Sequence, residues 1–346
     1  MSMTIKEIAK ICNVSTATVS RVINSPTQVS CNTRENVRKV IAKYHYAPNQ
    51  IAKNLSLKIS NSIAFFVFDI MNPFFTGLIR ELNKLAFDQN YSLVICDTDN
   101  SRERELKYIN YINMSKIAGL IMTEGVSANT INKIDNSCPV ICIDRYVKCN
   151  RDYLLVTSAN REGANEAVKY LVGLQHKKIA FVGGPEGIKT ADERKKGYLD
   201  VVQKYGLPVD ERYIFTGDFK KDSGLKAIKY FLSLDKMPTA IFCANDLMAE
   251  GIISGALSLG LDIPGDLSVI GFDGTSDNYF KKLTTVKQLL EEISRVVMSE
   301  LMKMINDANY RNNKEIRIPA QLVIGETCQK LNTNNINFQK EHRLIK

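Results

Sequence analysis

Two hydrophobic patterns divide this chain. Before residue 46, apolar residues recur at helical spacing, as at Ile5, Ile8, Ala9 and Cys12. From Ser62 onward, continuous apolar runs alternate with amphipathic segments. The runs predict strands at 63–69, 91–97, 117–122, 139–144, 179–184, 239–244 and 267–273, and the segments between them predict helices at 75–89, 163–174, 194–205 and 247–259. Repeated strand-helix units of this kind predict an α/β fold of parallel sheets covered by helices on both faces.

The N-terminal pattern predicts three short helices. Thr4 and Glu7 have the spacing of a capping box, Ser15 is placed to cap a second helix running to about Ile23, and Ser30 could cap a third. The apolar stripe of the third helix is expected at Val37, Val40, Ile41 and Tyr44. Two short helices joined by a tight turn are typical of a helix-turn-helix, although a small helical domain without DNA would share the pattern.

The distribution of charge favours DNA. Residues 1–60 contain nine lysines and arginines and two acidic residues, so they carry +7 of the net charge of +9. A compact basic module joined to a nearly neutral body is typical of a nucleic-acid-binding head.

Composition excludes several classes of protein. A chain of 346 residues is long enough for two or three folding units. It has no apolar run of the ~18–20 residues that cross a bilayer and no signal peptide, so we expect a cytoplasmic protein that does not bind membranes. The eight cysteines form no C-x-x-C pair and the three histidines have no metal-ligand spacing, so neither a metal nor a cofactor is expected. No nucleophile elbow, phosphate loop or H-E-x-x-H motif suggests an enzyme.

Polar and aromatic side chains follow the predicted strands, where open parallel sheets bind ligands. Planar amide, carboxylate and guanidinium groups suit hydroxyl pairs, and aromatic rings suit the C–H faces of a sugar, so the set suits a neutral polyol. Each residue taken alone could instead be a loop cap or turn former. The candidates are Asn72, Phe74, Phe75, Asp144, Arg145, Arg194 at an expected helix start, Phe219, Asn245, Asp273 and Gln288.

The chain resembles the lactose-repressor family of transcriptional regulators over nearly its whole length. The motifs TIKEIAKICNVSTATVSRVIN, YAPNQIAKNL, DIMNPFF, PTAIFCANDLMAEG and DIPGDLSVIGFD occur in the order of the family. The resemblance implies a three-helix helix-turn-helix head and a hinge helix, followed by two Rossmann-like subdomains of periplasmic-binding-protein type. We expect the head at 1–47, the hinge at 48–61, a sugar-binding and dimerisation core at 62–330 with crossovers near 157–162 and 284–290, and a disordered Asn-rich tail at 331–346.

The resemblance also implies roles in DNA binding. Thr16, Ala17 and Arg21 are the expected base-reading residues, and Leu55 is the hinge leucine expected to wedge between base pairs. The remaining expected DNA contacts are Thr4, Ser15, Thr18, Ser20, Asn24, Ser30, Thr33, Asn49 and Ala52.

The ligand motifs further resemble those of ribose-binding protein, with all ten candidate residues matching its sugar contacts. One departure is Ala159, which stands where the family usually has an aspartate before the asparagine at position 160. Ser56 follows the hinge leucine where purine-type members have a lysine, which argues against a purine repressor.

The sequence therefore predicts a repressor of a sugar-utilisation operon, a homodimer that leaves palindromic double-stranded operator DNA when a small sugar binds. Ribose or another pentose or hexose is favoured. Alternatives are a catabolite regulator controlled by a phosphorylated carrier protein, a sugar-binding transport protein, and an enzyme with a Rossmann-like core.

Overall fold

The computed structural model describes residues 3–24, 26–44, 60–99, 101–123, 131–144, 149, 151–276, 281–307, 309–310, 312 and 314–331. The chain divides into two compact units, Met1–Ser60 and Asn61–Lys346. Most of the expected hinge segment 48–61 and all but the first residue of the expected tail 331–346 lie outside the described residues. The boundaries proposed there stay predictions.

The first unit is helical, as its periodicity predicts. Thr4 and Glu7 form the expected capping box, and the Ser15 hydroxyl accepts the Thr18 amide at 3.0 Å. Ser30 occupies the predicted N-cap position of the third helix, although its side chain makes no cap hydrogen bond. Tyr44 lies exposed beyond the end of that helix and not in its apolar stripe, so that detail of the prediction was wrong. The elements are α1 (Ile5–Cys12), α2 (Thr16–Asn24), the 3₁₀ turn η1 (Pro26–Gln28) and α3 (Cys31–Lys43).

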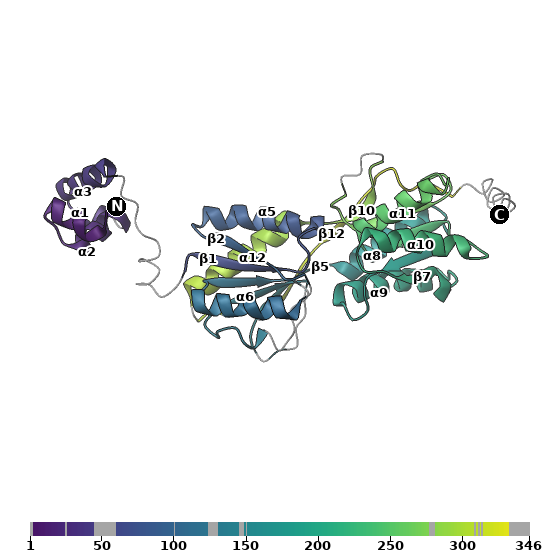
Figure 1. The fold of residues 1–346 in the computed structure, drawn as a ribbon. Coiled ribbons are helices and arrows are strands. Elements are labelled where there is room, and N and C mark those ends of the chain that lie inside the picture. The colour runs from purple at the N-terminus through teal and green to yellow at the C-terminus, as the bar shows by residue number, and fades with distance from the viewer. Residues whose placement is uncertain are drawn as a thin grey trace. The chain divides into compact units, whose positions relative to one another are not determined.

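The second unit contains two six-stranded sheets, each in its own subdomain (Figure 1). In the first subdomain the order is β11-β5-β4-β3-β1-β2, and all the neighbouring strands are parallel. Alternate side chains of β1 face α5 and α12 on one side and α6 on the other. The elements are β1 (Ser62–Val67), α5 (Pro73–Asp88), β2 (Ser92–Asp97), α6 (Arg102–Ser115), β3 (Gly119–Met122), β4 (Val140–Ile143), β5 (Leu154–Ser158), α12 (Leu290–Asn306) and β11 (Glu315–Ile318).

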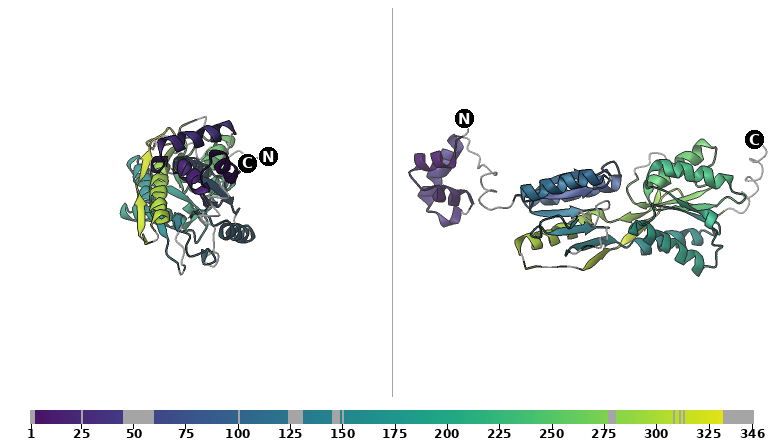
Figure 2. Two further views of the ribbon diagram at one scale, coloured as in Figure 1. Left: turned by 90° about the vertical axis from the view of Figure 1, so that its left-hand side faces the viewer. Right: turned by 60° about the horizontal axis from the view of Figure 1, so that its bottom comes forward.

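The second subdomain has the order β12-β10-β9-β8-β6-β7, parallel except for the antiparallel edge strand β12. Helices α8 and α9 pack against each other, as do α10 and α11, and Figure 2 shows helices on both faces of the sheet. The elements are α8 (Asn160–Gly173), β6 (Ile179–Gly183), α9 (Lys189–Lys204), η2 (Glu211–Tyr213), β7 (Ile214–Thr216), α10 (Lys221–Ser233), β8 (Ala240–Cys243), α11 (Asp246–Ser258), β9 (Ser268–Asp273), β10 (Thr284–Gln288) and β12 (Ala320–Val323).

The chain passes between the subdomains three times, after β5, after β10 and between β11 and β12. The last passage was not expected, because β11 and β12 are short and polar and were not recognised as strands. Helix α9 begins at Lys189, so Arg194 lies within the helix rather than at its start. These passages bring the carboxyl ends of strands from both sheets together around one cavity.

Candidate functional site

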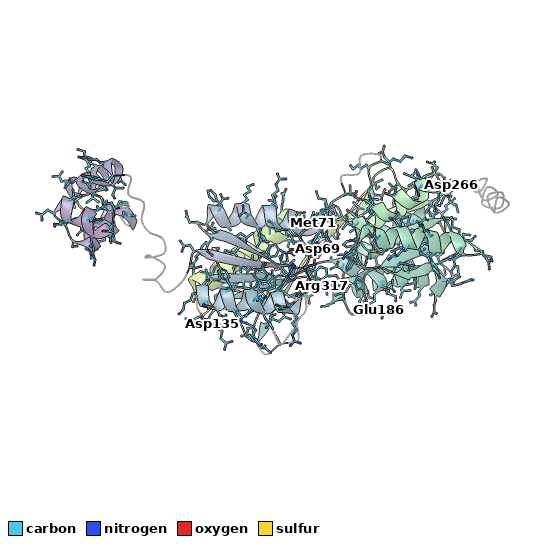
Figure 3. All side chains as sticks on the ribbon, viewed as in Figure 1. Asp69, Met71, Asp135, Glu186, Asp266 and Arg317 are labelled. Carbon is cyan, nitrogen blue, oxygen red and sulfur yellow. The ribbon has the colours of Figure 1, made fainter. Side chains whose placement is uncertain are left out.

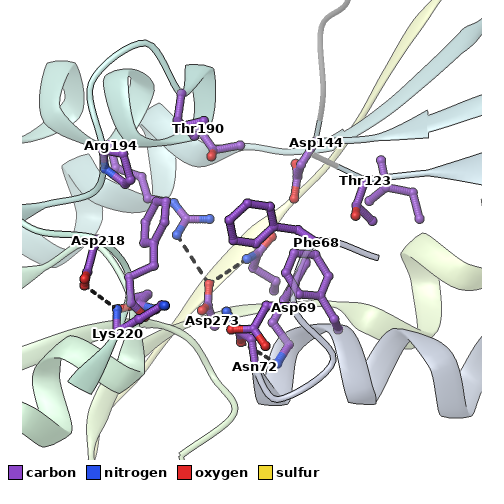
Figure 4. Close-up of a pocket in the computed structure, with 18 residues that line it drawn as sticks. Phe68, Asp69, Asn72, Thr123, Asp144, Thr190, Arg194, Asp218, Lys220 and Asp273 are labelled. Carbon is purple, nitrogen blue, oxygen red and sulfur yellow. Dashed lines mark hydrogen bonds and ion pairs between the residues drawn. The ribbon is translucent and has the colours of Figure 1, made fainter. Parts of the chain in front are cut away.

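A cavity of about 200 Å³ opens between the two subdomains of the second unit. Side chains that follow β1 and β4 line it from the first subdomain. From the second subdomain it is lined by side chains of α9, of the segment between β7 and α10, and of the ends of β8 and β9 (Figure 4). Nine of the ten candidate ligand residues line this pocket, and Arg145 lies outside the described residues. The nine are Asn72, Phe74, Phe75, Asp144, Arg194, Phe219, Asn245, Asp273 and Gln288.

A buried network centred on Arg194 and Asp273 forms the floor of the pocket. The Arg194 Nη1 atom lies 3.3 Å from Asp273 Oδ1, and both residues are at most 5% exposed. The Gln288 amide donates to the same oxygen at 2.8 Å. Arg194 also donates to Asn160 at 2.8 Å and to the Ala244 carbonyl at 2.5 Å. A buried charge is tolerated when it is paired and hydrogen-bonded in this way.

The first crossover contributes three positioning residues that were not among the candidates, Thr157, Ser158 and Asn160. The Ser158 hydroxyl donates to Gln288 Oε1 at 2.5 Å, and the Asn160 amide donates to the Ser158 carbonyl at 3.1 Å. The Thr157 hydroxyl and the Ser158 amide both donate to Asp144 Oδ1. The segment of Thr157 and Ser158 thus holds both Asp144, in the first subdomain, and Gln288, at the end of a strand in the second. Helix α8 begins at this segment without a side-chain cap, because Ala159 occupies its N-cap position.

Burial alters the acidity of two carboxyl groups at this site. It raises the pKa of Asp273 above its ordinary value, while the Arg194 charge opposes the rise. Burial also raises the pKa of Asp246, which begins α11, and hydrogen bonds from Thr285 and from the Thr275 amide oppose that rise. Asp246 therefore anchors the segment that follows Asp273.

Two of the candidate asparagines do cap helices, as the alternative interpretation of the sequence allowed. Asn72 Oδ1 accepts the Phe74 amide at 3.0 Å, and Asn245 Oδ1 accepts the Met248 amide at 3.0 Å. Both residues also line the pocket. The Asn245 Nδ2 atom donates to the Phe219 carbonyl at 2.8 Å, so this cap also positions an aromatic residue of the pocket.

Three pocket residues other than glycine have left-handed backbone conformations. The φ angles are 55° at Asp144, 64° at Phe219 and 115° at Asp273. L-residues rarely adopt such angles, which persist where the surrounding structure fixes them and which cluster at functional sites. The unusual φ angles at these three residues therefore accompany the placement of their side chains in the cavity.

Aromatic side chains occupy much of the remaining wall. Phe74 and Phe75 pack edge to face, with ring centroids 5.3 Å apart.

Sequence reasoning missed Phe68, Ile143 and several residues of the second subdomain, although most of them also lie near strand ends. Their position near the ends of predicted strands was the only sign in the sequence that these residues could belong to the site. The further lining residues are Asp69, Thr123, Pro185, Ile188, Thr190, Asp218 and Lys220.

An ion-pair cluster also joins the subdomains. Arg317, on β11 of the first sheet, donates to Glu315 at 2.6 Å and lies 3.7 Å from both Glu162 and Glu193 of the second subdomain. Figure 3 places Arg317 and Asp69 at the junction of the two subdomains. Glu193 precedes Arg194 on α9, so this cluster connects β11 to the helix that carries a pocket residue.

The first unit presents a candidate nucleic-acid interface. Thr16, Ala17 and Arg21 are exposed on α2, and Ser15 and Ser30 are exposed ahead of α2 and α3. Thr18, Ser20 and Thr33 are half-buried, and Thr4 is exposed at the start of α1. The Asn24 side chain and Asn49, Ala52 and Leu55 lie outside the described residues.

Within the described part of the chain, no group of three or more His, Cys, Asp or Glu side chains could hold a metal ion. No helix among those residues is both long and apolar enough to cross a membrane.

A helix-turn-helix unit joined to a two-subdomain binding core defines the class of the protein, a DNA-binding regulator with a ligand pocket. Residues 4–49 match the model of bacterial regulatory proteins of the lacI family, and residues 168–328 match that of a periplasmic binding protein-like domain. The chain is 34% identical to catabolite control protein A of Priestia megaterium, covering 88% of this chain and 93% of that protein. It is 32% identical to the ribose operon repressor of Halalkalibacterium halodurans, covering 94% and 97%.

The chain belongs to the lacI family of bacterial regulatory proteins. It is a DNA-binding transcriptional repressor and not an enzyme, as the sequence motifs predicted. Its fold is also that of the lac repressor dimer bound to operator and the anti-inducer ONPF, with a TM-score of 0.82, 24% identity, and coverage of 95% of this chain and 100% of that one. A lacI-family regulator from Enterococcus faecium with bound ribose matches with a TM-score of 0.70 and 25% identity, covering 78% and 100%.

Proposed function

We propose that this repressor is a cytoplasmic homodimer that leaves a palindromic operator when a small neutral sugar binds between its two core subdomains. The pocket carries the proposal, since carboxylate, amide and guanidinium groups from both subdomains converge on it beside aromatic rings. Ribose, or another pentose or hexose, is the favoured ligand. A relative named as a ribose operon repressor and a similar structure with bound ribose support that choice.

On the DNA side, Arg21 and its neighbours Thr16 and Ala17 read bases in the major groove, and the hydroxyls around them contact phosphates. A palindromic site requires two such heads related by a two-fold axis. Leu55 wedges between base pairs at the operator centre and bends the duplex. The exposed position of the base-reading side chains on α2 is compatible with these roles.

The switch follows from where the ligand binds. A sugar held by Asp144 of the first subdomain and by Arg194 and Asp273 of the second favours the arrangement that aligns them. A ligand shifts such an equilibrium only through its different affinities for the two states, typically by ~1–3 kcal/mol of coupling. The closed arrangement moves the first subdomain and, through the hinge, separates the paired heads.

The test starts by selecting an operator from random-sequence DNA with the full-length protein. Sugar titrations with and without that DNA then compare wild type with Arg194→Ala and Asp273→Ala, and with Asp192→Ala, an exposed control on the same helix. We expect both pocket variants to bind operator but not to release it, while wild type and Asp192→Ala release it. Reciprocity requires operator to weaken sugar binding by the same factor. Release of both pocket variants at the wild-type sugar concentration would show that the site lies elsewhere.

The identity to catabolite control protein A favours one second candidate, a regulator activated by a phosphorylated carrier protein. In that case the carrier protein, and not a sugar, would change operator affinity in the same titration.

A further inference from the structure

Arg317 links the two subdomains electrostatically at a place outside the pocket lining (Figure 3). It lies on β11, in register with Thr157 of β5, just before the chain passes between the subdomains for the last time. The three nitrogens of its guanidinium face three different carboxylates. Nε lies 2.6 Å from Glu315 of the same strand, Nη1 lies 3.7 Å from Glu162 of α8, and Nη2 lies 3.7 Å from Glu193 of α9. Arg317 therefore contacts two helices of the other subdomain.

The partners of Arg317 in the second subdomain lie beside residues that build the floor of the pocket. Glu193 immediately precedes Arg194 in α9, and Glu162 lies two residues after Asn160 at the start of α8. Arg194 donates to Asn160 at 2.8 Å, so the two helices are joined under the cavity. An ion pair that fixes α8 and α9 relative to β11 therefore also fixes the floor of the pocket relative to the first subdomain.

Without Arg317, the charges around Glu193 would repel one another across the junction. Burial raises the pKa of the Glu193 carboxyl, Arg317 and Lys189 oppose the rise, and Glu315 and Asp144 add to it by repulsion. Glu315 and Asp144 belong to the first subdomain, as Arg317 does. The first subdomain thus attracts Glu193 through one arginine and repels it through two carboxylates, so the sign of the interaction depends on the Arg317 charge.

We propose that Arg317 is a positioning residue for sugar binding, because its ion-pair cluster holds α8 and α9 in the arrangement in which both subdomains line the pocket. The inference rests on the proposed function and assigns a residue that controls how readily this arrangement forms. Ion pairs at partly exposed positions contribute modestly, and salt weakens them. A neutral sugar carries no charge, so moderate salt should change its affinity through the charges of the protein.

Calorimetric titration of the full-length protein with the neutral sugar that binds wild type tests the proposal at about 0.05 M and about 0.5 M salt. At low salt, Arg317→Gln should bind that sugar about threefold more weakly than wild type. At high salt the difference should largely disappear, because screening weakens the ion pairs of wild type. Arg212→Gln is the matched control, since it neutralises an exposed arginine whose partner Asp210 lies in the same subdomain, and it should behave as wild type does.

A double variant separates charge from packing. Arg317→Gln combined with Glu315→Gln removes both charges that β11 presents to the second subdomain, so the repulsion between Glu315 and Glu193 is also lost. This variant should bind the sugar roughly twofold more tightly than Arg317→Gln alone. If Arg317 acted only through the packing of its side chain, the second substitution would restore no affinity.

A distance measurement tests the ion-pair cluster without any sugar. Spin labels are attached through non-natural amino acids at the exposed positions Asn110 of α6 and Lys229 of α10, one in each subdomain. The labelled full-length protein is diluted with unlabelled protein, so that distances within one chain dominate. The distribution of distances should broaden in Arg317→Gln, and in wild type at high salt, but not in Arg212→Gln.

The outcomes separate this proposal from the proposed function. Equal sugar affinities of wild type and Arg317→Gln at low salt would overturn the role of Arg317, and so would a double variant that binds no more tightly than Arg317→Gln. A distance distribution that Arg317→Gln leaves unchanged would also overturn it. A wild-type protein that binds no neutral sugar would contradict the proposed function, and the distance distributions would then decide whether the cluster holds the subdomains.

Discussion

Close contacts at single residues shape the pocket. Gly184, which follows β6, is one such residue, because a Cβ atom added there would lie 2.2 Å from Cζ of the Phe219 ring. Real Cβ atoms do not approach a neighbour so closely, so the ring occupies space that only glycine leaves open. The Phe219 backbone is itself held at a φ of 64°. The position of the Phe219 ring thus depends on the absence of a side chain at Gly184.

We expect Gly184→Ala to displace the Phe219 ring and to weaken sugar binding about tenfold, which is ~1.4 kcal/mol. Isothermal titration of the variant with the sugar that binds wild type measures the effect. Gly173→Ala is the control, because a Cβ at Gly173 would meet no atom within 4 Å. Equal affinities of Gly184→Ala and wild type would mean that Phe219 does not contact the ligand.

The head offers a second prediction for a single side chain. Arg21 is exposed on α2, and Arg21→Ala should weaken specific operator binding by ~1–3 kcal/mol and relax the base preference at one position of each half-site. Lys10→Ala, which removes an exposed cation from α1, should weaken binding to all sequences alike. Competition with a library of singly substituted operators distinguishes the two. Unchanged selectivity in Arg21→Ala would remove Arg21 from the base-reading set.

At the scale of elements, buried polar bridges hold the ends of the second subdomain in place. His176, between α8 and β6, is 2% exposed. Its Nδ1 atom lies 3.0 Å from the Thr239 hydroxyl, and its Nε2 atom lies 3.0 Å from the Gln329 carbonyl. A neutral ring satisfies both partners if Nε2 donates to the carbonyl and Nδ1 accepts from the hydroxyl. The His176 side chain thereby links the segments that precede β6 and β8 to Gln329, near the C-terminal end of the described chain.

This bridge predicts a dependence of stability on pH. Burial lowers the pKa of His176 below its ordinary value, whereas the unfolded chain retains that value of about 6.5. At this site the unfolded state therefore binds more protons as pH falls below about 6.5, and the His176 contribution to the free energy of unfolding should decrease by up to ~1.4 kcal/mol per pH unit until the folded-state pKa is reached. The raised pKa values of Asp273 and Asp246 act in the opposite direction, so the His176 contribution must be measured against a variant that lacks it.

Urea unfolding of wild type and His176→Gln at pH 7.5 and at pH 5.5 isolates the His176 contribution, because the other titrating groups are common to both proteins. His176→Gln should be less stable than wild type at neutral pH, and this difference should shrink at pH 5.5. A stability difference that is equal at both pH values would show that His176 does not contribute to the pH dependence.

At the scale of the whole molecule, the proposed repressor requires two heads that act on one operator. We expect a dimer rather than a tetramer, because a palindromic operator has two half-sites related by a two-fold axis. Sedimentation velocity of the full chain, alone and with operator, measures the assembly. A stable tetramer, or a monomer that binds a palindrome tightly, would contradict this expectation.

The sequence by itself determined the class of each unit and most of the pocket. Apolar periodicity identified the helices of the head and seven strands, because buried faces impose a spacing that is visible along the chain. Residues after those strands could be assigned to one site, because parallel strands of a sheet end at the same edge. Asn72, Asp144 and Asp273 therefore meet in the structure as their places in the sequence suggested.

Only the tertiary structure decided which partners those residues have. Ser158 and Gln288 are 130 positions apart, and Arg194 and Asp273 are 79 apart, so no local pattern predicts their contacts. The strands β5, β7, β10, β11 and β12 were missed for a related reason. They are short or polar, and pairing with neighbouring strands, rather than their own periodicity, makes them strands. The partners of the pocket residues, and with them the geometry of the pocket, depend on these distant contacts.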